Sequence, residues 1–346
     1  MLPSLFYFGD GIQTVRKLNQ YSMKLNVHPS LRKCVILLTI SIGAHLSSFS
    51  QFSAGNYFEA GATIGPMVFL GDLGGHFGRG TSFIKDYNMK ATKLSFGAFI
   101  SAHPSEIVGF RLALTFGQLD GDDAYITGKG GMEEARLNRN LNFRSNIWEG
   151  YVAAEIYPTV FFEDDPTDVF ARLRPYGIIG VGVFHFNPQG SYVDANGQTN
   201  WVDLKPLHTE GEGWTEYPDR KEYNLTQINI PMGVGLKYYM NENVNLSFEI
   251  LHRVTFTDYI DDVSTTYIDP SLFYKYLSPS QAKIADMIYN KSPLRSNTPN
   301  ADYSPGAQRG DKTQNDAYFT AQFKIGFRLF PGREWRASTH CPLLRF

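Results

Sequence analysis

The chain has 346 residues, including 26 Phe, 20 Tyr and 32 Gly, and only 19% of its residues are charged. Its formal net charge is −2. Proteins that bind nucleic acid need a basic face, so this balanced charge excludes that class of partner. The many aromatic residues favour strands, and the many glycines favour tight turns.

Residues 23–50 are predicted to be a signal peptide. They begin with a positively charged stretch and continue with the apolar run Cys34 to Leu46, which is too short to cross a bilayer as a helix. A pattern of small residues ending at Ser50 predicts cleavage before Gln51. Residues 1–22 would then be a misplaced start of the chain. The alternative is that the apolar run forms a single helical anchor.

The part of the chain after Gln51 contains no run of eighteen apolar residues. If it crosses a membrane, it must do so as a closed β-barrel, which is the other structure that satisfies its backbone hydrogen bonds in lipid. In residues 317–330, every second residue from Phe319 to Leu329 is apolar, and Lys324 and Arg328 lie between them. This alternation is typical of a barrel wall with apolar residues outside and polar residues inside.

Eight such segments are the predicted strands: residues 57–70, 93–102, 106–116, 146–157, 174–186, 227–240, 244–256 and 317–330. The Gly-rich segment 174–186 leaves open which of its faces points outward. The connections 103–105, 158–173 and 241–243 are short or moderate, whereas the other four are long. Bacterial barrels place short turns in the periplasm and long loops outside, so this alternation predicts an orientation.

The longest connection, residues 257–316, contains two predicted helix starts. Asp269-Pro270 precedes one, and Ser278-Pro279 with Gln281 has a capping-box pattern at the other. The predicted fold is all-β: a closed antiparallel transmembrane β-barrel of about eight strands over residues 51–330, with long extracellular loops carrying short helices. Residues 331–346 lack alternation and are predicted to be an irregular tail.

Charged residues of both signs fall on the inward face of the predicted strands. This predicted lumen charge network consists of Arg111, Glu149, Glu155, Lys237, Glu249, Arg253, Lys324 and Arg328. Because an eight-stranded barrel is only wide enough for side chains to fill, these charges are expected to pair and to plug it. The alternative is a charged pathway for a solute.

A polar motif follows the seventh predicted strand and consists of Thr257, Asp258, Tyr259, Asp261, Asp262 and Ser264. Asp258, Asp261 and Asp262 could bind Ca²⁺ through oxygen ligands, or could form the solvated base of a loop. Asp120, Asp122 and Asp123 are predicted on the same side and could share that site. No other cofactor is expected.

No catalytic residues are predicted. A nucleophile, a base and an orienting group would have to converge, but His185 and His252 stand singly on strands. Aromatic residues near strand ends predict girdles at the membrane surfaces; they include Tyr57, Phe58, Tyr157, Phe161, Phe162, Phe184, Phe186, Tyr238 and Tyr239.

Several short motifs are similar to those of a known family. They are Gly71-Asp72-Leu73, Pro175-Tyr176-Gly177, Gly182 to Pro188, Thr209 to Gly213, Ile230 to Gly233, and Arg253 with Thr257-Asp258-Tyr259 and Asp261 to Ser264. In this order the chain resembles the PorG-like outer-membrane β-barrel component of the type IX (Por) secretion and gliding machinery.

The resemblance implies a non-enzymatic barrel of the bacterial outer membrane. Such a barrel would sit in outer-membrane lipid and hold periplasmic ring proteins of the secretion complex. The alternative function is a small outer-membrane porin or solute channel. The upstream extension and the tail both depart from the family pattern. The tail does so because a barrel usually ends with an aromatic residue on its last strand.

Overall fold

The computed structural model describes residues 57–74, 89–126, 133–162, 172–294 and 303–329. The chain divides into two compact units, Met1–Gln51 and Phe52–Phe346, and all described residues belong to the second. The predicted misplaced start, signal peptide and C-terminal tail lie outside the described residues.

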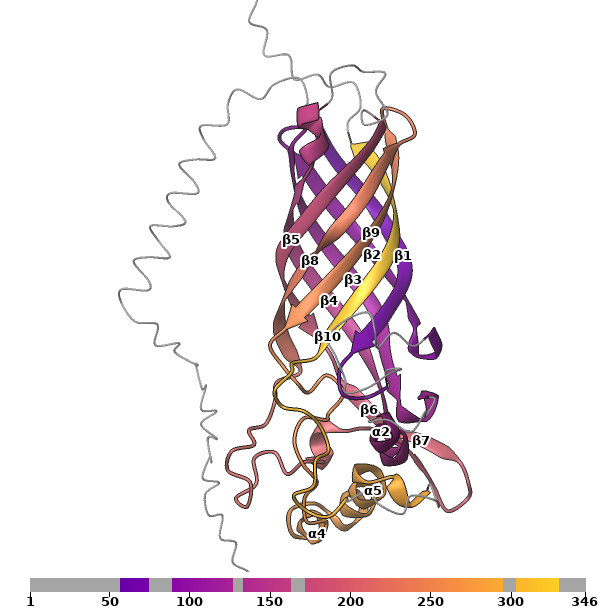
Figure 1. The fold of residues 1–346 in the computed structure, drawn as a ribbon, viewed down its shortest axis with the longest axis vertical. Coiled ribbons are helices and arrows are strands. Elements are labelled where there is room, and N and C mark those ends of the chain that lie inside the picture. Colours follow the sequence, from indigo (N-terminus) through magenta and orange to yellow (C-terminus); the bar gives the residue numbers. More distant parts are fainter. Residues whose placement is uncertain (1–56, 75–88, 127–132, 163–171, 295–302, 330–346) are drawn as a thin grey trace, which may run out of the picture. The chain divides into compact units, whose positions relative to one another are not determined.

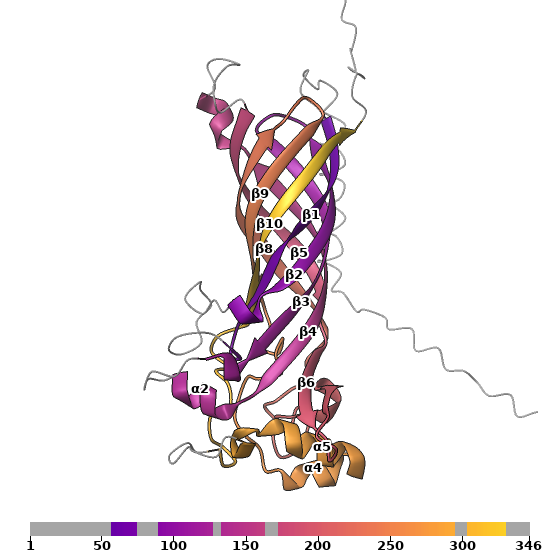
Figure 2. The same cartoon turned by 90° about the vertical axis from the view of Figure 1, so that its right-hand side faces the viewer.

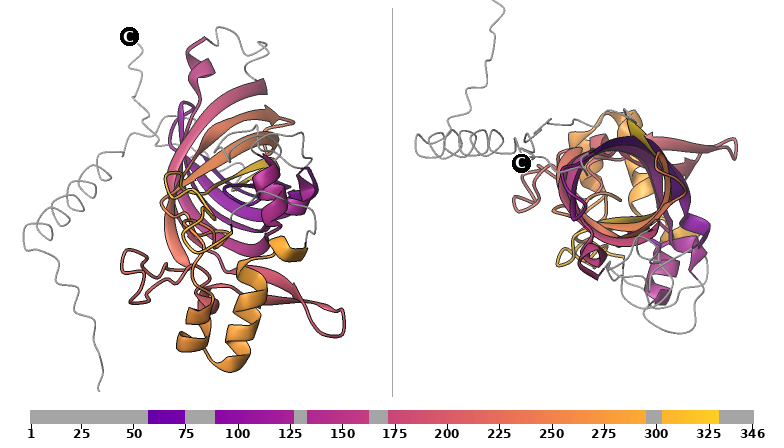
Figure 3. Two further views of the ribbon diagram at one scale, coloured as in Figure 1. Left: turned by 60° about the horizontal axis from the view of Figure 1, so that its bottom comes forward. Right: turned by 90° about the horizontal axis from the view of Figure 1, so that it is seen from above.

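Eight antiparallel strands close into a barrel, as predicted. They are β1 (Tyr57–Leu70), β2 (Lys93–His103), β3 (Val108–Asp122), β4 (Asn142–Ile156), β5 (Leu173–His185), β8 (Thr226–Tyr239), β9 (Val244–Thr255) and β10 (Ala317–Leu329). Each strand pairs with the next, and β10 pairs with β1 from Phe58↔Leu329 to Leu70↔Ala317. Figure 3 shows the closed ring when the barrel is viewed along its axis.

The predicted alternation of side chains is confirmed. On β3, Phe110, Leu112 and Leu114 are exposed on the outer wall, whereas Arg111 and Thr115 are buried in the lumen, the interior of the barrel. Closure pairs the backbone groups of the first and last strands, so the wall has no open edge to leave unsatisfied in lipid.

The outward face of β5, which the sequence left open, is now defined. Ile179, Val181 and Val183 are exposed on the outer wall, and Tyr176 and Phe184 are buried inside. The glycines of this strand hid the pattern because they carry no side chain that marks either face.

Short and long connections lie at opposite ends of the barrel, as the sequence predicted (Figure 1). The short end carries the 3₁₀ helix η4 (Pro158–Phe162). The long end carries η2 (Met89–Ala91), η3 (Asp123–Tyr125), α2 (Glu133–Arg139), the hairpin β6 (Pro188–Val193) and β7 (Thr199–Asp203), η5 (Lys205–Leu207), α4 (Ser271–Tyr276), α5 (Pro279–Tyr289) and η6 (Ser292–Leu294). We call the described residues of the four long connections the cap.

Both helices predicted in the longest connection are present as α4 and α5. Ser278 caps α5, where its hydroxyl accepts a hydrogen bond from the backbone N–H of Gln281 at 3.4 Å. The β6–β7 hairpin and α2 were not predicted. The hairpin continues the sheet from β4 through the pair Arg144↔Gln189, and Figure 2 shows β3 and β4 projecting toward it beyond the other strands.

Among the described residues, no helix is both long enough and apolar enough to cross a membrane.

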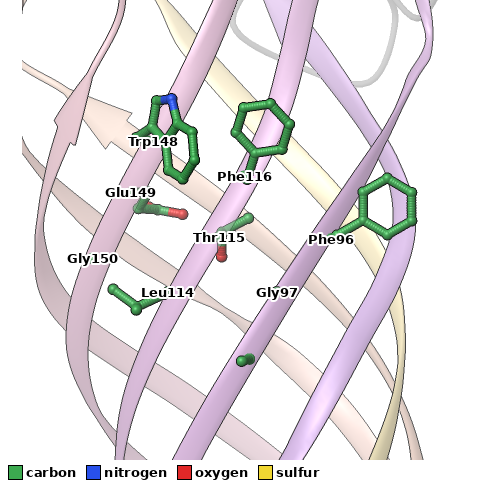
Figure 4. Close-up of a pocket in the computed structure, with 9 residues that line it drawn as sticks. Phe96, Gly97, Leu114, Thr115, Phe116, Trp148, Glu149 and Gly150 are labelled. Carbon is green, nitrogen blue, oxygen red and sulfur yellow. The ribbon is translucent and has the colours of Figure 1, made fainter.

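The outer wall presents apolar side chains around the barrel. Figure 4 shows the rings of Phe96 on β2, Phe116 on β3 and Trp148 on β4 beside a shallow groove of about 420 Å³. Gly97 and Gly150 line the same groove and leave it open between the larger side chains. Its apolar lining suits contact with the acyl chains of a bilayer.

A charge placed on the outer wall should cost more than the same charge on the cap. Leu114 is 65% exposed on the wall and Val193 is 53% exposed on the β6–β7 hairpin. We expect Leu114→Arg to lower the free energy of unfolding in lipid vesicles by about 2–4 kcal/mol, because the guanidinium would lie in hydrocarbon. Val193→Arg is the matched control and should change it little. Equal losses in the two variants would contradict a wall set in lipid.

Candidate functional site

A buried ion network crosses the lumen in the half nearer the short connections. The Arg111 guanidinium on β3 donates to both carboxylate oxygens of Glu249 on β9, at 2.9 and 2.8 Å, and its Nε donates to Glu155 on β4 at 2.6 Å. Lys324 Nζ on β10 lies 3.5 Å from Glu249 Oε2 and 3.8 Å from Glu155 Oε1. Arg111 on β3 and Lys324 on β10 therefore each contact the same two carboxylates, Glu155 and Glu249.

The same network extends to β1 and β8 through a residue that the sequence analysis missed. Lys237 Nζ on β8 lies 3.1 Å from Glu59 Oε2 on β1 and 3.9 Å from Glu155 Oε2. The His103 Nε2 atom is 3.8 Å from Glu59 Oε2. Glu59 is fully buried. In the sequence, Glu59 shares its alternate positions with Tyr57, Gly61 and Thr63, and these positions form the inward face of β1. The alternation of apolar and polar residues on this strand is weak.

A second layer of charge lies nearer the cap. Arg253 on β9 binds Glu149 on β4, with Nη2 at 3.0 Å from Oε2. Asn229 also donates to Glu149 at 2.7 Å, and Arg253 Nη1 donates to the Thr320 hydroxyl at 2.5 Å. The Glu149 carboxylate is thus satisfied by side chains from several strands.

Arg328 is the member of the predicted network that the structure places elsewhere. It is partly buried near the end of β10, and its guanidinium stacks over the Tyr57 ring at 4.2 Å. The other seven predicted residues are buried and meet in the two layers described above. Arg328 lies opposite Glu59 in the β1–β10 register, but Glu59 pairs with Lys237 and the Arg328 guanidinium stacks on Tyr57.

An apolar layer fills the lumen beyond the second charge layer. It contains Met67, Phe69, Leu119, Phe143, Ile147, Phe184, Phe186 and Tyr318, among other buried residues. The prediction of a membrane-surface girdle was wrong for Tyr157, Phe184 and Phe186, which are buried inside. Tyr57 also faces inward, where its hydroxyl meets that of Tyr239 at 3.1 Å and its ring stacks on His103. Inward aromatics at strand ends resemble girdle residues in sequence, because both occur near the rim.

The loop motif after β9 is a buried junction between cap segments. Asp262 has a φ of 64°, and its carboxylate accepts hydrogen bonds from the hydroxyls of Thr209 and Tyr223, both at 2.6 Å. Tyr259 stacks on Tyr223 with ring centroids 4.8 Å apart. The backbone N–H of Ser264 donates to Glu210 at 3.0 Å. The motif therefore binds the β5–β8 connection.

Other members of the motif bind the barrel rim. The Asp261 carboxylate accepts the backbone N–H of Leu73 at 3.0 Å and that of Val263 at 2.9 Å. The Thr257 carbonyl accepts the backbone N–H of Asp316 at 3.0 Å. Asp258 is buried, and neither of its carboxylate oxygens has a hydrogen-bond partner among the described residues.

The predicted Ca²⁺ ligands Asp258, Asp261 and Asp262 thus differ in their hydrogen-bond partners. Within the part of the chain that the structure describes, no three His, Cys, Asp or Glu side chains are arranged to hold a metal ion. The acidic residues at the end of β3 have partners of their own: Asp120 pairs with Lys93 at 3.4 Å, and Asp122 caps η3 through the N–H of Ala124.

Two buried arginines, which the sequence analysis did not single out, connect the cap loops. Arg139 on α2 pairs with Asp123 at 2.8 Å and also donates to the carbonyls of Asp72 and Arg309. Arg309 in turn pairs with Glu210 at 2.8 Å and donates to the Asp262 carbonyl at 2.7 Å. Because these contacts span the chain from Asp72 to Arg309, no local pattern indicates them.

Several cap carboxyls have perturbed pKa values. Burial raises the pKa of Asp262 to about 6, although the nearby Arg309 lowers it. Burial, with repulsion from Asp262 and Glu210, raises the pKa of Glu212 well above its ordinary value. The neighbouring carboxylates therefore disfavour the ionisation of Asp262 and Glu212.

The comparisons with known proteins identify no family for this chain. No protein-family model matches the sequence, and no curated protein matches it. The solved structures that are similar include Ail, the attachment invasion locus protein of Yersinia pestis, in complex with the heparin analogue sucrose octasulfate, at 8% identity and a TM-score of 0.32, covering 79% of this chain and 99% of that one.

Two further similar structures are outer-membrane barrels. A major outer membrane protein from Thermus thermophilus has 10% identity and a TM-score of 0.35, covering 79% of this chain and 99% of its own. The N-terminal β-barrel domain of Pseudomonas aeruginosa OprF has 12% identity and a TM-score of 0.26, covering 79% and 97%. At these values the likeness assigns no family, ligand or partner.

The structure itself decides the location. A closed antiparallel barrel with an apolar outer wall and a polar, buried interior is the structure that spans the bacterial outer membrane. The chain is therefore an outer-membrane β-barrel of eight strands.

Removing one cation from the lumen should strongly lower the stability of the barrel. Arg111→Met would leave Glu155 and Glu249 without their main partner in a water-poor interior, so we expect a loss of about 3–5 kcal/mol in the free energy of unfolding. Lys275→Met is the control, because Lys275 pairs with Glu216 at 2.5 Å on the exposed surface of the cap and should contribute little. Urea unfolding in vesicles measures both. A loss no larger for Arg111→Met than for Lys275→Met would contradict a tightly packed network.

The raised pKa of Glu212 predicts a pH dependence of the cap. A group with a raised folded-state pKa contributes most below its ordinary pKa, and this contribution is lost as the pH rises through the folded value. Glu212→Gln removes the ionisation, so we expect it to protect the cap from protease at about pH 9 and to have little effect at about pH 4. Glu222→Gln, at an exposed position, is the control. The same pH profile in Glu212→Gln and the wild type would refute this cause.

Proposed function

We propose that this outer-membrane barrel is a non-enzymatic component that anchors or organises a periplasmic protein-secretion complex. The resemblance of its motifs to the PorG-like component of the type IX machinery supports the proposal. The structural observation that carries it is the filled lumen. Two layers of paired charge and the apolar layer occupy the interior. A barrel of eight strands filled in this way suits an anchor better than a pathway for solutes.

The arrangement of the polar lumen residues also supports a structural role. Glu155, Glu249 and Glu149 each contact Arg or Lys side chains and are buried, so they do not present free carboxylates to a substrate. Catalysis requires a nucleophile and a base that reach a bound substrate. In the described part of the chain, these three carboxylates are instead engaged in holding strands together.

The short connections supply the surface for periplasmic partners. In outer-membrane barrels the short turns face the periplasm. At this end, Phe161 on η4 is 70% exposed, and Arg174 pairs with the exposed Glu106 at 3.1 Å. The turn 241–243 lies at the same end, between β8 and β9. These features form a compact face that an assembled ring of proteins could contact.

Charge reversal at this end should weaken the complex. Glu163, Asp164 and Asp165 follow η4 in the sequence and lie outside the described residues. We expect their joint replacement by Lys to reduce co-purification of periplasmic partners from solubilised outer membranes, because three negative charges would become positive. The matched control replaces three exposed acidic residues of the cap, Asp219, Glu222 and Asp286, by Lys and should leave co-purification unchanged.

Two results would contradict the proposal. One is equal recovery of partners with both triple variants and the wild type. The other is a stable open conductance of the purified wild-type protein in planar bilayers, which would favour the small porin. The Glu149–Arg253 pair gives an internal check, since a conducting lumen must pass it and Arg253→Ala would then change the conductance.

A further inference from the structure

Two buried carboxylates at the junction of barrel and cap have oxygens without hydrogen-bond partners among the described residues. Asp258 is 7% exposed and Asp316 is 1% exposed. Neither oxygen of Asp258 nor Oδ1 of Asp316 has a partner among the described residues. Ser264 lies near enough to lower the pKa of Asp258, yet it does not reach hydrogen-bond geometry. Buried carboxylate oxygens are normally satisfied, so three free oxygens here call for a ligand.

The two carboxylates are held on one short stretch of structure. Asp316 is the last residue before β10, and its Oδ2 accepts the backbone N–H of Ile260 at 2.8 Å. Its own N–H donates to the carbonyl of Thr257, next to Asp258. The pairing of Ala317 with Val254 places the two segments side by side. Asp316 is thus held by backbone hydrogen bonds next to Asp258.

Other carboxyl groups surround these two. The carboxylates of Asp72 and Asp261 lie close enough to raise the pKa of Asp316. Each of these already accepts a backbone N–H, from Asp311 at 2.6 Å and from Leu73 at 3.0 Å. Arg139 lowers the pKa of both Asp72 and Asp261, but its guanidinium is bound to Asp123.

The main chain at Gly71 lies close to the Asp316 carboxylate. Gly71 follows β1, and a Cβ atom at this position would collide with Asp316 Oδ1 and with the Phe69 ring. A glycine here lets the main chain between β1 and Asp72 come up against the free carboxylate oxygen. Main-chain carbonyls and carboxylates are the oxygen ligands that Ca²⁺ takes.

We propose that Asp258 and Asp316 bind a Ca²⁺ ion at the junction of β9, β10 and the β1 rim. The donor atoms are all oxygens, which selects a hard cation, and the irregular loop setting suits Ca²⁺ better than the near-octahedral demand of Mg²⁺. Two side chains supply three oxygens, so main-chain carbonyls and water complete the shell. This agrees with the absence of any three-carboxylate metal cluster among the described residues. The site is independent of the proposed periplasmic role.

A weak site of this kind has a defined range of affinity. Extracellular Ca²⁺ modules bind with dissociation constants on the order of 10⁻⁴–10⁻³ M. Because only two carboxylates supply ligands here, we expect a dissociation constant in that range. The long connections of an outer-membrane barrel face the outside of the cell. Ca²⁺ there would offset the charge of four clustered carboxylates and hold β9, β10 and the β1 rim together.

The test uses the full chain refolded in detergent and freed of divalent ions. Isothermal titration with CaCl₂ should show binding in the stated range, and Ca²⁺ should slow proteolytic cleavage of the cap. Asp258→Asn and Asp316→Asn keep the side-chain volume and remove the charge. We expect each to weaken binding by about tenfold or more and to abolish the protection by Ca²⁺. Asp286→Asn, at an exposed position of α5, should bind like the wild type.

Three outcomes would overturn the proposal. The first is no binding and no protection of the wild type at about 10 mM CaCl₂, tenfold above the weakest expected constant. The second is unchanged affinity in Asp258→Asn. The third is equal protection by MgCl₂ at the same concentration, which would indicate general screening. If Asp316→Asn fails to form the barrel, judged by circular dichroism, Asp258→Asn and the comparison of Ca²⁺ with Mg²⁺ still decide.

Discussion

The structure depends on one constraint: in lipid, every backbone N–H and C=O of the wall must be paired within the wall. Closing the sheet between β1 and β10 meets that constraint, and it also sends every second side chain into a narrow lumen. Polar residues placed there lose contact with bulk water, so charged ones must meet opposite charges. The pairing of Arg111 with Glu155 and Glu249 is therefore a consequence of closure as well as a support for it.

The lumen network differs in kind from the ion pairs on the cap surface. Exposed pairs gain little because water screens them. In the lumen, removing a partner would leave a bare charge in a space that other side chains already fill. The network also joins strands that do not pair directly, because Glu249 on β9 meets Arg111 on β3 as well as Lys324 on β10. This gives a physical reason why the lumen charges serve the barrel itself.

Much of the wall could be predicted from the sequence, since alternation with a period of two is a local property. The strand set, the sorting of loops and the inward position of seven charged residues followed from it. The phase of β5 did not, because Gly177, Gly180 and Gly182 carry no side chain. Glu59 was missed on a weakly alternating strand. The cap arginines Arg139 and Arg309 could not be found at all, since their partners lie far away in the chain.

The contact between Asp72 and Asp311 has a consequence for how the chain assembles. These residues follow the first strand and precede the last, and the backbone N–H of Asp311 donates to Asp72 at 2.6 Å across 239 positions of sequence. Because both residues flank the seam between β1 and β10, this part of the cap depends on the same closure that completes the barrel. A contact of such long range has a large loop-closure entropy when the chain is open, and the paired β1 and β10 lower that cost by holding the two residues close together.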